Sequence, residues 1–252
     1  MILTWLSFYD ALLAAALMAA GIVSAHYEMT PPYRGFQIFL IGFFFATIAF
    51  IFGLISIFVT SSASRRAGRP RAILGTILAL ALAGPVLIVV SQHRAIPIND
   101  ITTDALDPPQ FVAASDLPAN RGRSMGYDPR FAAIQHIAYP ALEPLRLPGT
   151  PEEVYERVEI MAGEIPDWHI TRNDPKTREL EGVATSALFK FKDDFIIEVR
   201  PGEGGMSVVE MRSKSRDGIS DLGANYDRIS SFWRILKAGP RSAPPGTAQV
   251  QP

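Results

Sequence analysis

The residues best suited to bind a ligand lie in the polar stretch Arg212–Asp221, which leads into the last predicted helix, and in the first turns of that helix. Free backbone N–H groups at a helix start, together with guanidinium groups, can hold a phosphate or a carboxylate. A structural role competes with this one, because Ser220 or Asp221 can cap the helix while the arginines pair with neighbouring aspartates. We favour the structural role, since ion-pair networks resemble functional clusters. The candidate anion-binding or partner-binding residues are Arg212, Ser213, Ser215, Arg216, Ser220, Asp221, Asn225 and Arg228.

A second polar segment offers oxygen atoms. Asp100, Thr102, Asp104 and Asp107 could surround a hard cation such as calcium, which takes about six to eight oxygen ligands. Their spacing is not that of an EF-hand loop, and Asp and Thr commonly bond to nearby backbone in turns. We therefore predict local turns at Asp100, Thr102 and Asp104, and no metal site.

Motifs for catalysis or cofactor binding are absent from the sequence. It has no Gly-x-Ser-x-Gly elbow and no His-Glu-x-x-His pair, and His93, His136 and His169 each stand alone. The absence of cysteine excludes disulfides, thiol catalysis and cysteine-ligated zinc. No cofactor is predicted, and an enzymatic function is unsupported.

Three apolar stretches dominate the first 92 residues. Met1–Ala25, Phe36–Thr60 and Ala72–Val90 each approach the roughly 20 apolar residues needed to cross a bilayer. We predict three membrane spans, at about residues 2–25, 36–60 and 72–90. Glycines within them would permit close helix contact, namely Gly42, Gly53, Gly75 and Gly84.

Arginines predict the orientation of these spans. The short loop Ser61–Arg71 holds Arg65, Arg66, Arg69 and Arg71, and positive loops remain in the cytoplasm. The N-terminus is then cytoplasmic, and the polar half of the chain lies outside. We expect a multi-pass protein of the bacterial inner membrane with a periplasmic domain.

The polar half predicts an α+β domain over residues 96–237. Ala95–Pro148 lacks periodicity and is predicted to be extended. Thr150 begins a capping box before a helix from Pro151 to about Glu164. Alternation then predicts an antiparallel meander of strands over residues 180–187, 189–191, 194–200 and 206–213, before an amphipathic helix over residues 221–237. Helices would flank this sheet, and residues 238–252 are predicted to be disordered.

Three separated motifs resemble an uncharacterised family, domain of unknown function 1499, over about residues 96–236. The first is Ile98–Asp104 with Asp107–Phe111, the second is Tyr139-Pro140 with Pro144-Leu145, and the third is Arg212–Gly223 with Asn225 and Arg228. The resemblance implies a domain boundary and no reaction. Some members begin with a cysteine-containing segment that this chain lacks, so a role for that thiol is excluded.

The sequence therefore leaves more than one class of function open for this protein. We expect a non-catalytic envelope protein that displays its domain to a partner; the alternative is a binder or carrier of a lipid-like or anionic ligand, and an enzyme of unknown class comes third. Expected partners are the lipid bilayer, other membrane-protein subunits and a lipid-like ligand. Nucleic acid is not expected, because 24 basic residues are balanced by 25 acidic ones. A closed apolar cavity under the last helix would favour the carrier, and a flat exposed patch would favour a protein partner.

Overall fold

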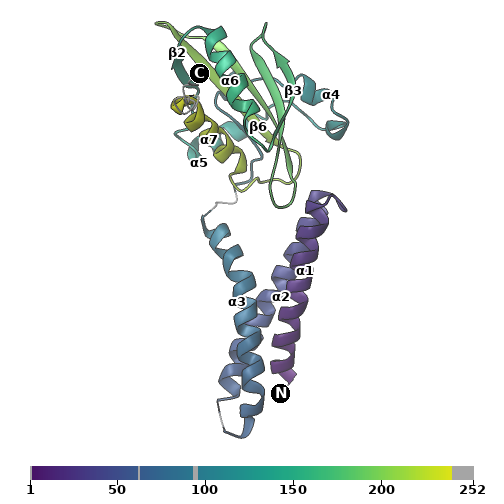
Figure 1. Cartoon of the computed structure of the whole chain (residues 1–252). Helices are drawn as coiled ribbons and strands as arrows, with labels where there is room; N and C mark the ends of the chain where they lie inside the picture. The colour runs from purple at the N-terminus through teal and green to yellow at the C-terminus, as the bar shows by residue number, and fades with distance from the viewer. Residues whose placement is uncertain (1, 62, 93–95, 240–252) are drawn as a thin grey trace, which may run out of the picture. The chain divides into compact units, whose positions relative to one another are not determined.

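The computed structural model describes residues 2–61, 63–92 and 96–239 (Figure 1). The chain divides into two compact units. The first contains Met1–Ala95 with Ser186–Phe191, and the second contains Ile96–Thr185 with Lys192–Pro252. The predicted disorder of residues 238–252 concerns residues that, apart from Ala238 and Gly239, lie outside the described part.

The first unit contains three long apolar helices, as predicted. They are α1 (Ile2–His26), α2 (Pro32–Val59) and α3 (Arg69–Gln92), with a short 3-10 helix, η1 (Ala63–Gly68), before α3. Each helix is long and apolar enough to cross a membrane. The apolar stretches of the sequence therefore form helices that can anchor the chain in a bilayer.

Small residues let these helices approach closely. A Cβ atom added to Gly42 would lie 2.7 Å from the Met18 side chain, and one added to Gly75 would lie 2.6 Å from Ser7 Oγ. An added Cβ at Gly53 would overlap Thr76. Gly84 differs from the expectation, because the neighbour within 4 Å of its added Cβ is Leu80 of its own helix. Helix contact in this unit thus depends on the absence of side chains at Gly42, Gly53 and Gly75.

The loop Ser186–Phe191 also belongs to the first unit. Strand structure predicted at residues 189–191 is wrong: Lys190 has a positive φ of 59°, and its N–H donates to the carbonyl of Ser186 at 3.2 Å in a turn. The Phe189 and Phe191 rings lie 5.3 Å and 5.8 Å from that of Phe36. Aromatic contacts within the unit, and not sheet alternation, explain these phenylalanines.

The second unit is built on one antiparallel sheet. Its strands are β1 (Asp100–Thr102), β2 (Leu145–Pro148), β3 (Trp168–Asp174), β4 (Glu179–Thr185), β5 (Lys192–Pro201) and β6 (Met206–Ser215). The order is β1-β6-β5-β4-β3, and β2 pairs with the other end of β6. The predicted meander is present, and β3 extends it by a strand that the sequence pattern did not reveal.

Helices α6 (Pro151–Gly163) and α7 (Ala224–Ala238) cover one face of the sheet (Figure 1). The predicted capping box is confirmed: Thr150 Oγ1 accepts the N–H of Glu153, whose carboxylate accepts the N–H of Thr150. Phe195, Ile197 and Val199 point from β5 into the fully buried core between sheet and helices. Alternation along β5 therefore predicted the buried face, and the fold is α+β.

The segment expected to be extended, Ala95–Pro148, contains β1, β2 and short helices. These helices are α4 (Ala113–Asp116), α5 (Arg130–Ala138) and the 3-10 turn η2 (Pro118–Asn120). Tertiary contacts hold them. Gln135 of α5, for example, accepts the Thr102 N–H at 3.0 Å and donates to the Thr102 carbonyl at 2.6 Å. These elements are held by contacts with distant residues and show no regular spacing of apolar residues, so the sequence pattern did not predict them.

Candidate functional site

Arg212 lies on the face of β6 opposite α7 and is fully buried. Its Nε and Nη2 donate to the two carboxylate oxygens of Asp100 at 2.9 Å and 2.8 Å. The same guanidinium donates to the carbonyls of Pro109 at 3.2 Å and Met125 at 2.9 Å. Its planar fork therefore joins β1 to the segment that crosses this face of the sheet.

Arg216, like Arg212, is paired with a buried aspartate, in this case Asp194. Its Nη2 lies 2.6 Å from Asp194 Oδ1, and the Asp194 side chain is fully buried. Asn120 of η2 donates to the other oxygen of Asp194 at 2.9 Å. On the same face, the buried Glu181 carboxylate accepts the N–H groups of Val112, Ala113 and Ala114 at the start of α4. Together with Arg212, these two carboxylates hold residues 109–125 against the sheet.

A second group of the predicted residues lies on the opposite face of β6, against α7. Ser213 Oγ donates to Asn225 Oδ1 at 2.8 Å, and Asn225 donates to Ser215 Oγ at 3.0 Å. Arg228 donates to Ser213 at 2.8 Å and forms an ion pair of 2.5 Å with Asp193. The structure thus gathers four predicted residues here, and places Arg212 and Arg216 on the other side of the sheet.

The loop before α7 is closed by Asp221. Its carboxylate accepts the N–H groups of Gly223 and Asn225, both at 2.9 Å, and burial raises its pKa above the usual value. Ser220 Oγ accepts the Leu222 N–H at 3.4 Å. The first two N–H groups of α7 therefore have acceptors on Asp221, since the Ala224 N–H donates to its carbonyl at 3.1 Å. An anion at the Asn225 N–H would have to displace the Asp221 carboxylate.

The second polar segment forms local contacts. Asp104 Oδ1 accepts the N–H groups of Leu106 at 2.8 Å and Asp107 at 3.1 Å, which is an Asx turn. Thr102 Oγ1 donates to the Asp104 carbonyl at 3.0 Å, and Asp100 is engaged by Arg212 and Lys214. Among the described residues, no group of three or more His, Cys, Asp or Glu side chains could hold a metal ion.

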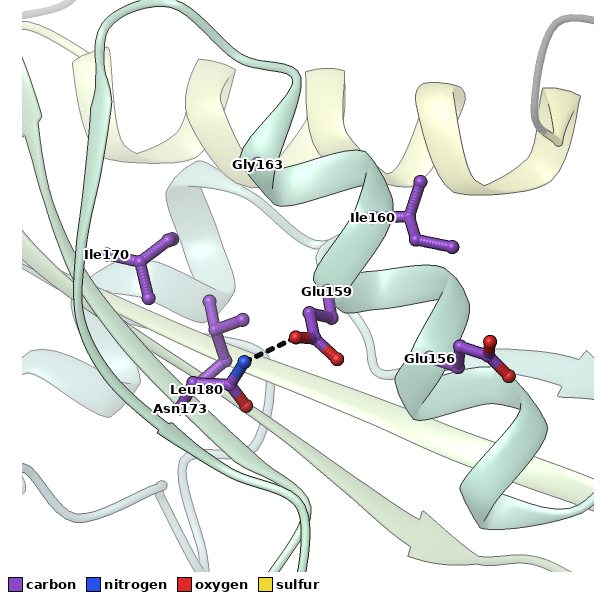
Figure 2. A pocket seen from close by; sticks show the side chains of 7 residues that line it. All are labelled: Glu156, Glu159, Ile160, Gly163, Ile170, Asn173 and Leu180. Atoms are coloured by element: carbon purple, nitrogen blue, oxygen red, sulfur yellow. Dashed lines mark hydrogen bonds between the residues drawn. The ribbon is translucent and has the colours of Figure 1, made fainter.

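An open groove runs between α6 and the edge strand β3 (Figure 2). Its volume is about 480 Å³. Glu159 of α6 accepts a hydrogen bond of 2.5 Å from Asn173 of β3, which also accepts one from the Tyr155 hydroxyl at 2.7 Å. The lining residues are Glu156, Glu159, Ile160, Gly163, Ile170, Asn173 and Leu180. Sequence reasoning missed this groove, and the only available signal was the row of glutamates on the predicted helix.

A second cavity, of about 600 Å³, lies beside β2 and the early part of β6. It contains Arg146 and Arg200, which could suggest an anion site. Arg200, however, already pairs with Asp107 at 2.9 Å and Glu198 at 3.4 Å, and it contacts Glu210. Arg200, whose side chain is 32% exposed, is thus surrounded by three carboxylates, and its charge adds little attraction for an anionic ligand.

Comparison with known proteins adds a family assignment. A family model described as "Protein of unknown function (DUF1499)" matches residues 100–236, which is more than half of the chain. No curated protein and no solved structure matches the chain significantly. The matched residues begin at β1 and end in α7, so they comprise nearly the whole of the second unit.

Proposed function

The chain belongs to the DUF1499 family, and from this premise we propose that it is a membrane-anchored, non-catalytic interaction protein. Its folded domain captures a segment of a partner protein in the groove between α6 and β3. Three helices able to cross a membrane supply the anchor. The partner is a further subunit of a membrane complex, held near the domain by the same bilayer.

The groove is the observation that carries this proposal. Glu152, Glu156 and Glu159 follow one another along α6 at spacings of four and three residues, so they share one side of the helix. Glu156 is exposed and has no ion-pair or hydrogen-bond partner among the described residues. Beside them, Ile160 is 50% exposed and Ile170 is partly buried. Such a surface suits a segment with a basic residue next to an apolar one.

The edge of the sheet favours a peptide over a small molecule. β3 pairs with β4 on one side, and in the described residues its other edge has no neighbouring strand. Backbone groups on such an edge can bond to an added segment. The register shift between Ile170 and Arg172 interrupts the edge, which limits this pairing to a short stretch.

A carrier of an apolar ligand would need space under α7. That space is filled by Ile229, Phe232 and Leu236, all fully buried. The Trp168 ring lies 4.2 Å from that of Phe195 and 5.0 Å from that of Phe232. Close packing at this position supports the interaction protein over the carrier.

The proposal also places the domain outside the cytoplasm, in the periplasm of a bacterial cell. Its support is four arginines at one end of the second and third helices, since positively charged short loops and span ends remain inside. Arg65 and Arg66 lie in η1, and Arg69 and Arg71 lie in the first turn of α3. A reporter that is active only in the periplasm should be active when fused after Leu236 and silent when fused at Ser64. The reverse pair of results would contradict this orientation.

Affinity capture of the full-length protein in mild detergent tests the groove. The wild type should retain one partner in fixed ratio, identified by mass spectrometry, and Glu156→Lys should lose it. Glu203→Lys is the matched control, because it makes the same charge change in the exposed turn between β5 and β6. Equal capture by wild type and both variants would reject the groove as the binding surface.

A further inference from the structure

Helix α1 carries an ionisable side chain, Asp10, well inside its apolar length. Asp10 follows Ile2 by eight residues and precedes His26 by sixteen, so a rise of about 1.5 Å per residue places it about 6 Å from the middle of the helix. In a bilayer that α1 spans, with a hydrocarbon layer about 30 Å thick, this position lies within the hydrocarbon. Charged groups are costly at such depths, and those that occur there usually mark a functional site.

The headgroup level at this end of α1 is marked by Trp5. The Arg71 guanidinium lies 3.7 Å from the centroid of the Trp5 ring, and tryptophan is enriched at the membrane interface. Asp10 lies five residues further along α1, which is about 7.5 Å deeper. Lysine and arginine can reach back to an interface because their stems are long, whereas aspartate has a short side chain. The Asp10 carboxylate therefore stays among apolar groups.

Asp10 forms no hydrogen bond or ion pair within the part of the chain that the structure describes. By contrast, Ser7 Oγ donates to the Ala49 carbonyl at 3.0 Å, and Thr76 Oγ1 donates to the Ala72 carbonyl at 2.7 Å. The lysine and arginine residues of α1, α2 and α3 are confined to the first turns of α2 and α3, where they are Arg34, Arg69 and Arg71. The three helices therefore hold no lysine or arginine at the depth of Asp10.

The Asp10 carboxylate can be reached from outside the three-helix unit. The stripe of α1 that packs against α2 and α3 contains Ala11 and Ala14, which are fully buried. Asp10 is only partly buried, and Leu6 and Leu13, one turn before and after it, are 39% and 43% exposed. A helix of another protein can therefore approach Asp10 from the surrounding lipid.

We propose that Asp10 is a docking site, within the bilayer, for a transmembrane helix of another protein that carries a lysine or arginine at the same depth. Charge complementarity identifies this occupant, because a nearby cation stabilises a carboxylate that lies among apolar groups. A second copy of this chain would bring a second carboxylate to Asp10 and no cation, so self-association through Asp10 is not expected. This contact is separate from the α6–β3 groove and does not depend on it.

A model helix is the probe for this site. Synthetic transmembrane peptides of about 21 leucine and alanine residues carry either a lysine or a leucine at the centre, and an energy-transfer acceptor at one end. The chain has no cysteine, so Ser61→Cys, at an exposed position just after α2, gives a single site for the donor. The labelled full-length protein and each peptide are combined in phosphatidylcholine vesicles.

Three substitutions are compared in this labelled protein. Asp10→Asn keeps the shape of the side chain and removes its charge, and Asp10→Glu keeps the charge. Glu203→Gln is the matched control, because it removes a carboxylate from the exposed turn between β5 and β6. The charge at position 10 is thus separated from a general change in the charge of the protein.

The lysine peptide should bind the protein about three- to tenfold more tightly than the leucine peptide, the range expected for a polar contact between membrane helices. Asp10→Asn should abolish this preference, whereas Asp10→Glu and Glu203→Gln should retain it. Equal binding of both peptides to the protein with Asp10 intact would overturn the proposal, and that comparison requires no variant to fold. Retention of the full preference by Asp10→Asn would also overturn it. Neither peptide has a segment for the α6–β3 groove, so these results are independent of the proposed function.

Discussion

Arg212 is buried in an ion pair with Asp100, and its substitution can distinguish a structural role of this arginine from a ligand-binding role. Arg212→Met removes the charge and keeps most of the aliphatic volume. It leaves the fully buried Asp100 carboxylate with Lys214 at 2.8 Å as its remaining charged partner. It also removes the donors to the carbonyls of Pro109 and Met125.

The expected loss of stability follows from these contacts. Breaking a buried ion pair on one side typically costs about 3–5 kcal/mol, because a charge stays buried without compensation. Lys214 offsets part of that cost, whereas the two carbonyls add to it, so we expect about 3–4 kcal/mol. Arg212→Lys should also destabilise the domain, since lysine cannot reproduce the two parallel hydrogen bonds.

Urea unfolding of the full-length protein in mild detergent measures this loss through tryptophan fluorescence, since Trp168 and Trp233 pack in the core of the domain. The control is Arg130→Met, because Arg130 is 88% exposed in its pair with Asp128 and should leave the midpoint unchanged. If Arg212→Met unfolded at the wild-type midpoint but lost its partner, Arg212 would be a binding residue and our reasoning would be refuted.

Three further predictions concern the folded domain and use the same unfolding measurement. Thr150→Ala removes one half of the capping box and should cost about 1 kcal/mol; an unchanged midpoint would show that water replaces the cap. Ile197→Asp places a charge in the core and should prevent folding, whereas Leu106→Asp at a 99% exposed position should be tolerated. Burial raises the pKa of Tyr155 to about 12, so the unfolded state loses its proton first and stability should fall as pH rises above about 10. Tyr155→Phe should flatten that fall, and an identical pH profile would contradict the assignment.

Much of this fold was predictable because its elements follow local rules. The capping box at Thr150, the alternation of Phe195, Ile197 and Val199, and the long apolar helices can each be recognised from residues that lie near one another in the sequence. These patterns need no knowledge of distant contacts. They predicted the α+β class, the core face of β5 and the membrane anchor.

The remaining elements depend on partners far along the chain. Helix α4 has four residues, and its N–H groups are satisfied by Glu181, which lies about 70 positions later. β3 is an edge strand whose burial pattern does not alternate cleanly. The sequence pattern shows neither the distant partner of α4 nor the edge position of β3, so both of these elements were missed.

The candidate site shows the same limit. Arg212, Ser213 and Arg216 are close in sequence, yet successive residues of a strand face opposite sides of the sheet. Arg212 and Arg216 therefore bond to Asp100 and Asp194, whereas Ser213 bonds to Asn225 on the other face. The groove could not be predicted, because α6 and β3 create it by packing side by side.

The claim that a partner binds between α6 and β3 is tested most directly by photo-crosslinking in intact cells. A photoreactive side chain is introduced at Ile160, which is 50% exposed in the groove, and separately at Ile137, which is 82% exposed on α5 outside the residues that line it. Our account predicts one crosslinked partner of defined mass from position 160, absent from position 137 and lost when Glu156→Lys is added. Crosslinks of equal yield from both positions, or none from position 160, would contradict it.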